Sequence, residues 1–201
     1  MVKIVESNLV FTSGRVERRL SARRSTQRIA IHHTASGDVS AETVHGWHRN
    51  RGWMGIGYHY LVRQSGDIER GRAEELRGIH ASAANADSIA IALAGNFELA
   101  PPAADQLDAL VWLIRDIHSR YGELTLIRHR DLQATACPGR LFPWEEMLRR
   151  IQQRTHLVVR GDTLFSLARR YGVTVEQLRQ WNNLSSGVIR VGQLLVVSQN
   201  I

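Results

Sequence analysis

The sequence of 201 residues has a single cysteine, Cys137, and one thiol cannot form an intrachain disulfide. The fold therefore does not depend on an oxidising compartment. No apolar run approaches the roughly 18 residues that a membrane-spanning helix needs, so we expect no membrane insertion. The first residues also lack the apolar core of a secretory signal, which predicts a protein made in the cytoplasm without a signal peptide.

Lysine is almost absent as well. Lys3 is the only lysine among 26 basic residues, and the net charge is +7. This excess of positive charge favours an anionic partner, either a nucleic acid or an anionic cell envelope. The sequence has no recognised nucleic-acid-binding motif, so we expect that nucleic acid is not the partner. Arginines are concentrated near the start, where a solvated basic arm is the simplest interpretation: Arg15, Arg18, Arg19, Arg23, Arg24 and Arg28.

The hydrophobic pattern over most of the chain switches several times between the strand period and the helix period. Strands are predicted at 28–32, 58–63, 68–70, 88–93 and 124–128. Helices are predicted at 40–49, from Pro101-Pro102 to Gly122, and at 143–152. Strands that alternate with helices in this way are typical of an α/β fold.

After about Arg154 a separate pattern begins. A strand is predicted at 156–159, then a helix with Asp162 as its N-cap, a second helix opened by a capping box at 174–177, and a strand at 192–197. This β-α-α-β unit predicts a small second domain. We expect a catalytic domain at 1–152 and a second domain at 156–198, without a linker rich in proline or glycine between them.

The strongest chemical signal is that Cys137 follows His129 by eight residues, while His32 ends a predicted strand far upstream. Two histidines and a thiolate form a three-ligand zinc site with an open fourth position, as a metal hydrolase requires. His129 also follows a predicted strand, and α/β folds assemble their sites at strand ends. The residue types leave two alternatives open: a buried apolar cysteine, and a nucleophilic pair of Cys137 with His129.

Four motifs follow one another in a recognisable order. They are His32-His33-Thr34-Ala35, the segment Trp47 to Trp53, the segment Gly55 to Tyr60, and His129-Arg130-Asp131 through Cys137-Pro138-Gly139. Together they resemble the zinc N-acetylmuramoyl-L-alanine amidases of the phage T7 lysozyme and peptidoglycan-recognition-protein type. The resemblance covers roughly residues 26 to 152 and implies a central mixed β-sheet flanked by helices.

The resemblance also implies roles for individual residues. It places a Zn²⁺ ion on His32, His129 and Cys137, and catalytic roles on Tyr58 and Thr135. Contacts with the substrate are implied for four further residues: His33, Trp53, His80 and Asn85. The expected reaction is hydrolysis of the amide between the lactyl group of N-acetylmuramic acid and L-alanine by a zinc-activated water.

One position departs from the family pattern. Phage enzymes of this kind often have a lysine two residues before the cysteine, where this sequence has Thr135. Threonine donates a hydrogen bond but supplies no cation, so oxyanion stabilisation would rest on zinc and Tyr58. Some catalytic recognition proteins also have threonine there. Non-catalytic relatives typically lose the cysteine, so Cys137 favours an enzyme over a peptidoglycan-binding receptor of the same fold.

The C-terminal segment resembles a LysM module over roughly residues 156 to 198, with Val158 to Leu164, Tyr171-Gly172 and Ile189 to Val196 as its main matches. This resemblance implies binding to glycans such as peptidoglycan. Taken together, the two domains predict that the protein is a monomeric endolysin of phage or prophage type. It would reach the cell wall after the membrane has been permeabilised.

Overall fold

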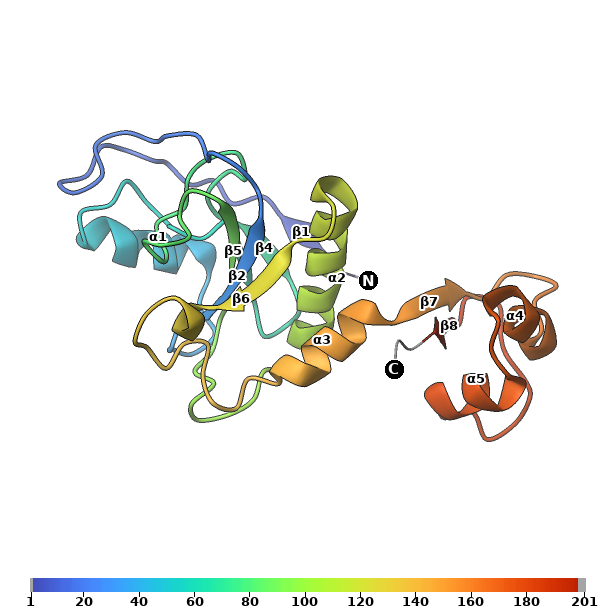
Figure 1. The fold of residues 1–201 in the computed structure, drawn as a ribbon. Coiled ribbons are helices and arrows are strands. Elements are labelled where there is room, and N and C mark those ends of the chain that lie inside the picture. Colours follow the sequence, from blue (N-terminus) through green and yellow to red (C-terminus); the bar gives the residue numbers. More distant parts are fainter. Residues whose placement is uncertain (1, 199–201) are drawn as a thin grey trace. The chain divides into compact units, whose positions relative to one another are not determined.

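The computed structural model describes residues 2–198 and divides the chain into two compact units (Figure 1). The N-terminal unit is Met1–Pro143 and the C-terminal unit is Trp144–Ile201. The division falls at the start of the helix predicted at 143–152, which was expected in the first domain. The domain limits 1–152 and 156–198 remain predictions.

The N-terminal unit contains a six-stranded mixed sheet, as expected. Its strands are β1 (Ile4–Val5), β2 (Arg28–His33), β3 (Tyr60–Val62), β4 (Ile68–Arg70), β5 (Ser88–Leu93) and β6 (Thr125–Arg128), in the order β1-β4-β3-β5-β2-β6. Strand β2 runs parallel to both β5 and β6, and only the β3–β4 hairpin is antiparallel. All six residues of β5 are buried, which explains their unbroken apolar run.

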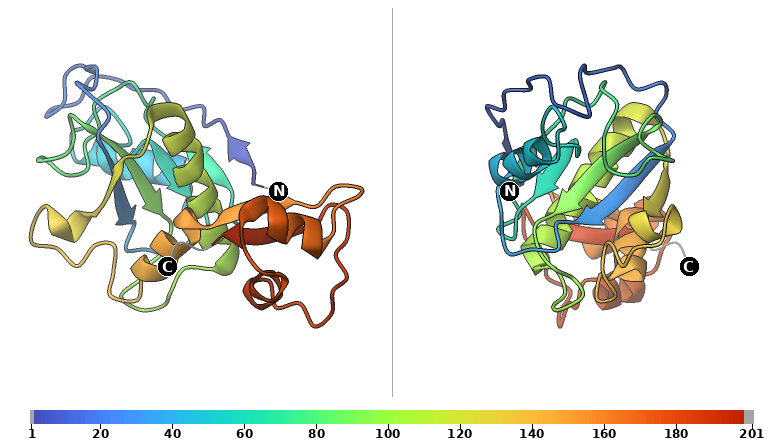
Figure 2. Two further views of the ribbon diagram at one scale, coloured as in Figure 1. Left: turned by 45° about the vertical axis from the view of Figure 1, so that its right-hand side comes forward. Right: turned by 90° about the vertical axis from the view of Figure 1, so that its left-hand side faces the viewer.

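Two helices of this unit lie on opposite faces of the sheet (Figure 2). Helix α1 (Ala41–Asn50) begins where predicted, because the side chain of Ser40 accepts a hydrogen bond from the Thr43 amide. Helix α2 (Ala104–Tyr121) follows the two prolines and ends at Gly122, whose φ of 82° suits glycine. Residues of α1 pack with Leu61 and Ala92, so the α1 face of the sheet holds one hydrophobic cluster.

The N-terminal segment differs from the predicted solvated arm. The two-residue strand β1 pairs with β4, and the main chain of Arg23 and Arg24 bonds to later loops. Arg28 forms an ion pair with Asp87 at 2.6 Å. The segment is therefore bound along the unit, because its backbone groups find partners there.

A buried ion pair fixes the same segment. The guanidinium of Arg72 is 0% exposed and binds the carboxylate of Glu17 through Nη1 at 2.6 Å and Nη2 at 3.0 Å. The carboxylate also accepts the Met54 amide at 2.9 Å, while Arg72 Nε donates to the Ile56 carbonyl. Such satisfied geometry is what a buried charge requires.

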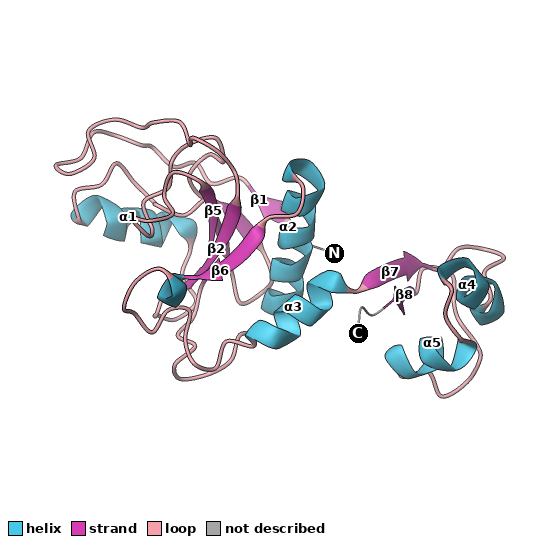
Figure 3. Cartoon of the chain, viewed as in Figure 1, coloured by secondary structure: helices cyan, strands magenta, loops and turns pink. Residues whose placement is uncertain are grey.

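The C-terminal unit contains α3 (Trp144–Gln152), β7 (Arg154–Leu157), α4 (Leu164–Tyr171), α5 (Val175–Trp181) and β8 (Leu194–Ser198), as Figure 3 shows. Strands β7 and β8 pair antiparallel, which confirms the β-α-α-β pattern. The predicted capping box of Thr174 with Gln177 is present. The N-cap of α4 is Thr163, so the prediction of Asp162 was wrong: its carboxylate accepts from the Val159 amide instead.

Within residues 2–198, none of the helices combines the length and the apolar character that crossing a membrane requires.

Candidate metal centre

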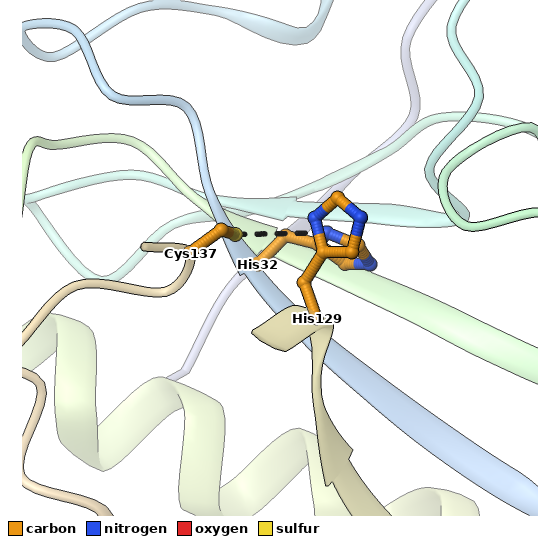
Figure 4. A group of neighbouring side chains, drawn as sticks. All are labelled: His32, His129 and Cys137. Atoms are coloured by element: carbon orange, nitrogen blue, oxygen red, sulfur yellow. Dashed lines mark hydrogen bonds between the residues drawn. The ribbon is translucent and has the colours of Figure 1, made fainter. Parts of the chain in front are cut away.

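The register of two parallel strands brings two histidines together. Ile31 of β2 pairs with Arg128 of β6, so the next residues, His32 in β2 and His129 just after β6, lie at the same level. Their ring centroids are 4.6 Å apart. Cys137 lies beside them, with Sγ 3.8 Å from His32 Nδ1. One donor atom from each residue lies within 4.8 Å of the others, and Figure 4 shows the three side chains converging.

The loop after β6 holds Cys137 in place. The Arg130 amide donates to the Cys137 carbonyl at 3.0 Å, and the Cys137 amide donates to Thr135 Oγ1 at 3.3 Å. The sulfur itself accepts the His33 amide at 3.4 Å. Thr135 therefore supports the backbone of the cysteine, a role that the sequence did not reveal.

A chain of hydrogen bonds defines the protonation of His32. Ser88 Oγ donates to the Ala84 carbonyl at 2.7 Å, which leaves its lone pairs to accept from His80 Nε2 at 3.2 Å. His80 Nδ1 then lacks a proton and accepts from His32 Nε2 at 3.0 Å. A neutral His32 consequently has its free lone pair on Nδ1, the atom that faces Cys137.

The protonation and pairing of the two histidines test whether a metal fits. The Nε2 of His129 is buried and has no hydrogen-bond partner among the described residues, whereas buried polar atoms are normally paired. Burial lowers the pKa of both His129 and His32, so both rings are neutral at neutral pH. Two neutral imidazoles and one sulfur, with one donor atom each within 4.8 Å of the others, form a donor set suited to zinc.

The alternative of a nucleophilic cysteine fits less well. Burial raises the pKa of Cys137 to about 11, so the metal-free side chain is a thiol at neutral pH. The imidazole nitrogen that contacts its sulfur is that of His32, not that of His129. A coordinated divalent cation would remove the thiol proton outright, whereas a neutral imidazole lacks the charge to do so.

Tyr58 lies against the same cluster. Its ring centroid is 5.1 Å from that of His32, and burial, together with the nearby Cys137, raises the pKa of its hydroxyl. Tyr58 therefore stays a neutral phenol, able to donate a hydrogen bond. Its position depends on Gly57, where an added Cβ would lie 1.8 Å from the Ile79 carbonyl oxygen.

The four residues expected to contact substrate lie in different surroundings. His33 is buried, and its Nδ1 accepts the Phe97 amide. His80 lies between His32 and Ser88, as described above. The buried Asn85 accepts the amides of both His80 and Ala81 through Oδ1. Trp53 is half-buried and borders a surface cavity together with Asn85. Contacts of these residues with a substrate remain predictions.

Two residues that support the site, Ser88 and His48, were not among the site residues predicted from the sequence. Ser88, the first residue of a predicted strand, ends the hydrogen-bond chain to His32. His48 accepts the Gly57 amide through Nδ1 at 2.9 Å and packs 5.3 Å from Tyr58. Its place in the Trp47–Trp53 motif was the available signal, but spacing alone does not tell a supporting histidine from a ligand.

Comparisons with known proteins agree with this geometry. Residues 22–140 match the model of the N-acetylmuramoyl-L-alanine amidase family, and residues 156–198 match that of the LysM domain. The endolysin of Escherichia phage T7 is 31% identical over 125 residues, which cover 58% of this chain and 83% of that protein.

Solved structures show the same relationship. The N-acetylmuramoyl-L-alanine amidase LysC from Clostridium intestinale URNW is 37% identical with a TM-score of 0.68, covering 72% of this chain and 94% of that one. Drosophila PGRP-LB, at 24% identity and a TM-score of 0.63, shares the fold over 71% of this chain and 91% of its own. The matched region contains the entire cluster of His32, His129 and Cys137. The chain thus belongs to the N-acetylmuramoyl-L-alanine amidase family and carries a LysM domain at its C-terminal end.

Proposed function

We propose that the chain is a zinc-dependent N-acetylmuramoyl-L-alanine amidase, with His32, His129 and Cys137 as the ligands. The observation that carries the proposal is the convergence of one donor atom from each of His32, His129 and Cys137 to within 4.8 Å of one another. When bound, zinc supplies a Lewis acid that polarises the scissile carbonyl and lowers the pKa of water to about 7. Three protein ligands leave the open position that this chemistry needs.

The surrounding residues supply the remaining functions. Tyr58, kept neutral by burial, donates its phenolic hydrogen to the oxygen of the scissile carbonyl as negative charge develops there. Thr135 holds the main chain of Cys137, so it acts on the reaction through the ligand geometry. The product would be a glycan strand separated from its stem peptide.

The C-terminal unit would hold the enzyme on its substrate. We infer that this LysM domain binds the glycan of peptidoglycan, because residues 156–198, from within β7 to the end of β8, match the LysM model. A cavity of about 560 Å³ lies beside its α5–β8 connection, lined by polar groups that include Asn183, Arg190 and Gln193. Attachment to an insoluble polymer raises the local concentration of the catalytic domain.

The biological role that fits these parts is that of a monomeric endolysin. Relatives from phages T7 and KP32 carry that name. Such an enzyme would be made in the cytoplasm and would act on the cell wall once the membrane is permeabilised.

The direct test uses purified peptidoglycan and metal-free protein, with and without one equivalent of zinc. Restoration by zinc, with new N-terminal alanine and no new reducing ends, is the expected result. Cys137→Ser, which preserves size but replaces the thiol, should lose both zinc and activity. Full hydrolysis after complete zinc removal would instead support the cysteine nucleophile. Binding without hydrolysis in either state would identify a peptidoglycan receptor.

A further inference from the structure

One face of the two-stranded sheet in the C-terminal unit is apolar and exposed. Side chains along a strand alternate between the two faces of a sheet. Around β7 and β8, the helix-facing set includes Val158 and Leu195, which are buried in a cluster with residues of α4 and α5. Leu157, Val159 and Leu194 alternate with them and are 55%, 52% and 62% exposed. We call these three residues the outer face.

The outer face is continuous across the two strands. Leu157 and Leu194 are direct partners in the antiparallel pair, so their side chains lie next to each other. Beyond them, the Gly192 amide donates to the Val158 carbonyl at 2.8 Å, so the pairing continues. Val159 therefore lies across from Gly192, which has no side chain to cover it. A contiguous exposed apolar patch of this kind indicates an interaction surface.

Positive charge flanks the outer face along the chain. Arg154 begins β7, and Arg160 directly follows Val159. Both arginines are exposed, and within residues 2–198 neither takes part in an ion pair. Their guanidinium groups are therefore available to an anion from outside.

The acidic residues of this unit do not neutralise the two arginines. Residues 154–198 contain six arginines and two acidic residues. Asp162 binds His156 at 2.7 Å, and Glu176 binds Arg179 at 3.3 Å. Both carboxylates thus have other partners, and the surroundings of the outer face keep a net positive charge.

An apolar face between arginines fits the surface of an anionic membrane. Apolar side chains enter the boundary between headgroups and acyl chains, and guanidinium groups bind lipid phosphates. A second copy of this chain fits less well, because it would bring the same positive charges together. A glycan also fits less well, because the outer face has neither a hydrogen-bonding side chain nor an aromatic ring.

We propose that the outer face is a peripheral binding site for anionic phospholipid membranes. Leu157, Val159 and Leu194 would lie at the level of the headgroups, with Arg154 and Arg160 on the lipid phosphates. Such attachment lies on the membrane and needs no spanning helix. This binding requires neither the amidase reaction nor the glycan site proposed above.

The test measures sedimentation of the full-length protein with vesicles of phosphatidylcholine alone and of three parts phosphatidylcholine to one part phosphatidylglycerol. The parent chain should bind the anionic vesicles at least about tenfold more tightly, because each arginine near such a surface favours binding. Leu157→Thr with Leu194→Thr should weaken this binding at least about tenfold, while threonine remains suited to a strand. The matched control, Val10→Thr with Leu99→Thr, changes two residues of the N-terminal unit that are 70% and 79% exposed. It should bind within about twofold of the parent chain.

A second pair of variants tests the charges without changing the apolar residues. Arg154→Gln with Arg160→Gln should weaken binding to the anionic vesicles at least about tenfold. Arg15→Gln with Arg24→Gln removes two exposed arginines of the N-terminal unit and should leave it within about twofold. Equal binding of the parent chain to both kinds of vesicle would overturn the proposal. A loss confined to the Arg15 and Arg24 variant would also overturn it, because lipid binding would then belong to the N-terminal segment.

Two further measurements identify a different occupant of the outer face. A parent chain that is dimeric in sedimentation equilibrium, with a monomeric leucine variant, would make the face an interface between copies. A leucine variant that no longer binds purified peptidoglycan would assign the face to the glycan. Either result would replace the lipid. We expect a monomeric parent chain and a leucine variant that binds peptidoglycan as the parent does.

Discussion

His80 Nδ1 lies 3.0 Å from His32 Nε2, on the edge of the imidazole opposite to the nitrogen that faces Cys137. His80 would thus act on a metal bound at the proposed site through His32. Partners of this kind orient a ligand and raise its basicity, and their loss typically costs about 10–100-fold in metal affinity. We expect His80→Ala to weaken zinc binding by that factor, measured by competition with a chromogenic chelator.

The control for this prediction is a second variant, at a position further from His32 in the same hydrogen-bond chain. Ser88→Ala removes only the outer acceptor and should weaken zinc binding less than His80→Ala does. The ¹⁵N shifts of His32 in the metal-free protein should report a proton on Nε2 in the parent chain. An unchanged zinc affinity in His80→Ala would show that the contact is only structural.

Tyr58→Phe tests the proposed hydrogen bond to the developing oxyanion. The ring contact with His32 would remain, while the donor would be lost. We expect kcat to fall by about 10²–10³-fold, the typical effect of removing one such donor. KM and the zinc content should stay near those of the parent enzyme, measured by steady-state kinetics and metal analysis. A fall in zinc content would mean that Tyr58 supports the ligands rather than the reaction.

Stability should fall on the acid side of neutrality because the fold buries neutral histidines. Burial lowers the pKa of His59 to about 4, from an unperturbed value near 6.5. The folded pKa lies below the unfolded one, so stability is complete above about pH 6.5 and is lost as the pH falls towards 4. Each pH unit in this window should cost roughly 1.4 kcal/mol for such a histidine.

Urea unfolding between pH 4 and 8 measures this dependence. His59→Asn retains an acceptor for the Ala90 amide, which His59 Nδ1 accepts at 2.8 Å, but has no titratable group. The variant should be less stable at pH 7 and should show a shallower slope below pH 6.5. An identical slope in both proteins would assign the acid sensitivity to other groups.

Gly57→Ala should damage both the fold and the site. The new methyl group would meet the Ile79 carbonyl oxygen at 1.8 Å, so either Tyr58 or the loop before His80 must move. We expect a loss of roughly 1–3 kcal/mol, the usual cost of overpacking, together with reduced activity. Gly37→Ala is the matched control, since nothing lies within 4 Å of its added Cβ. Thermal melts of both variants give the comparison.

Much of the N-terminal sheet was predictable because its strands are local and strongly patterned. The apolar run of β5 and the capping serine of α1 are local signals: each predicts a strand or a helix from a few consecutive residues. The convergence of His32 with His129 followed from their positions at strand ends. The site residues themselves came from the resemblance to a family.

Other features depend on contacts between distant residues and leave no local signal. Strand β1 has two residues, too few for any period, and pairs with a strand more than sixty positions away, Ile4 with Ile68. The link between His32 and His80 spans 48 positions. At α4, two adjacent candidates could cap the helix, and the choice of Thr163 depends on Asp162 finding other donors.

The Glu17–Arg72 pair shows that the folded N-terminal unit depends on residues outside the family match. The family match begins at residue 22, yet the counter-charge of the fully buried Arg72 comes from residue 17. A catalytic fragment cut at the start of the match would leave a guanidinium without its carboxylate, and breaking such a pair typically costs about 3–5 kcal/mol. We therefore expect that a stable amidase fragment of this chain must begin before Glu17, upstream of the residues that the family model matches.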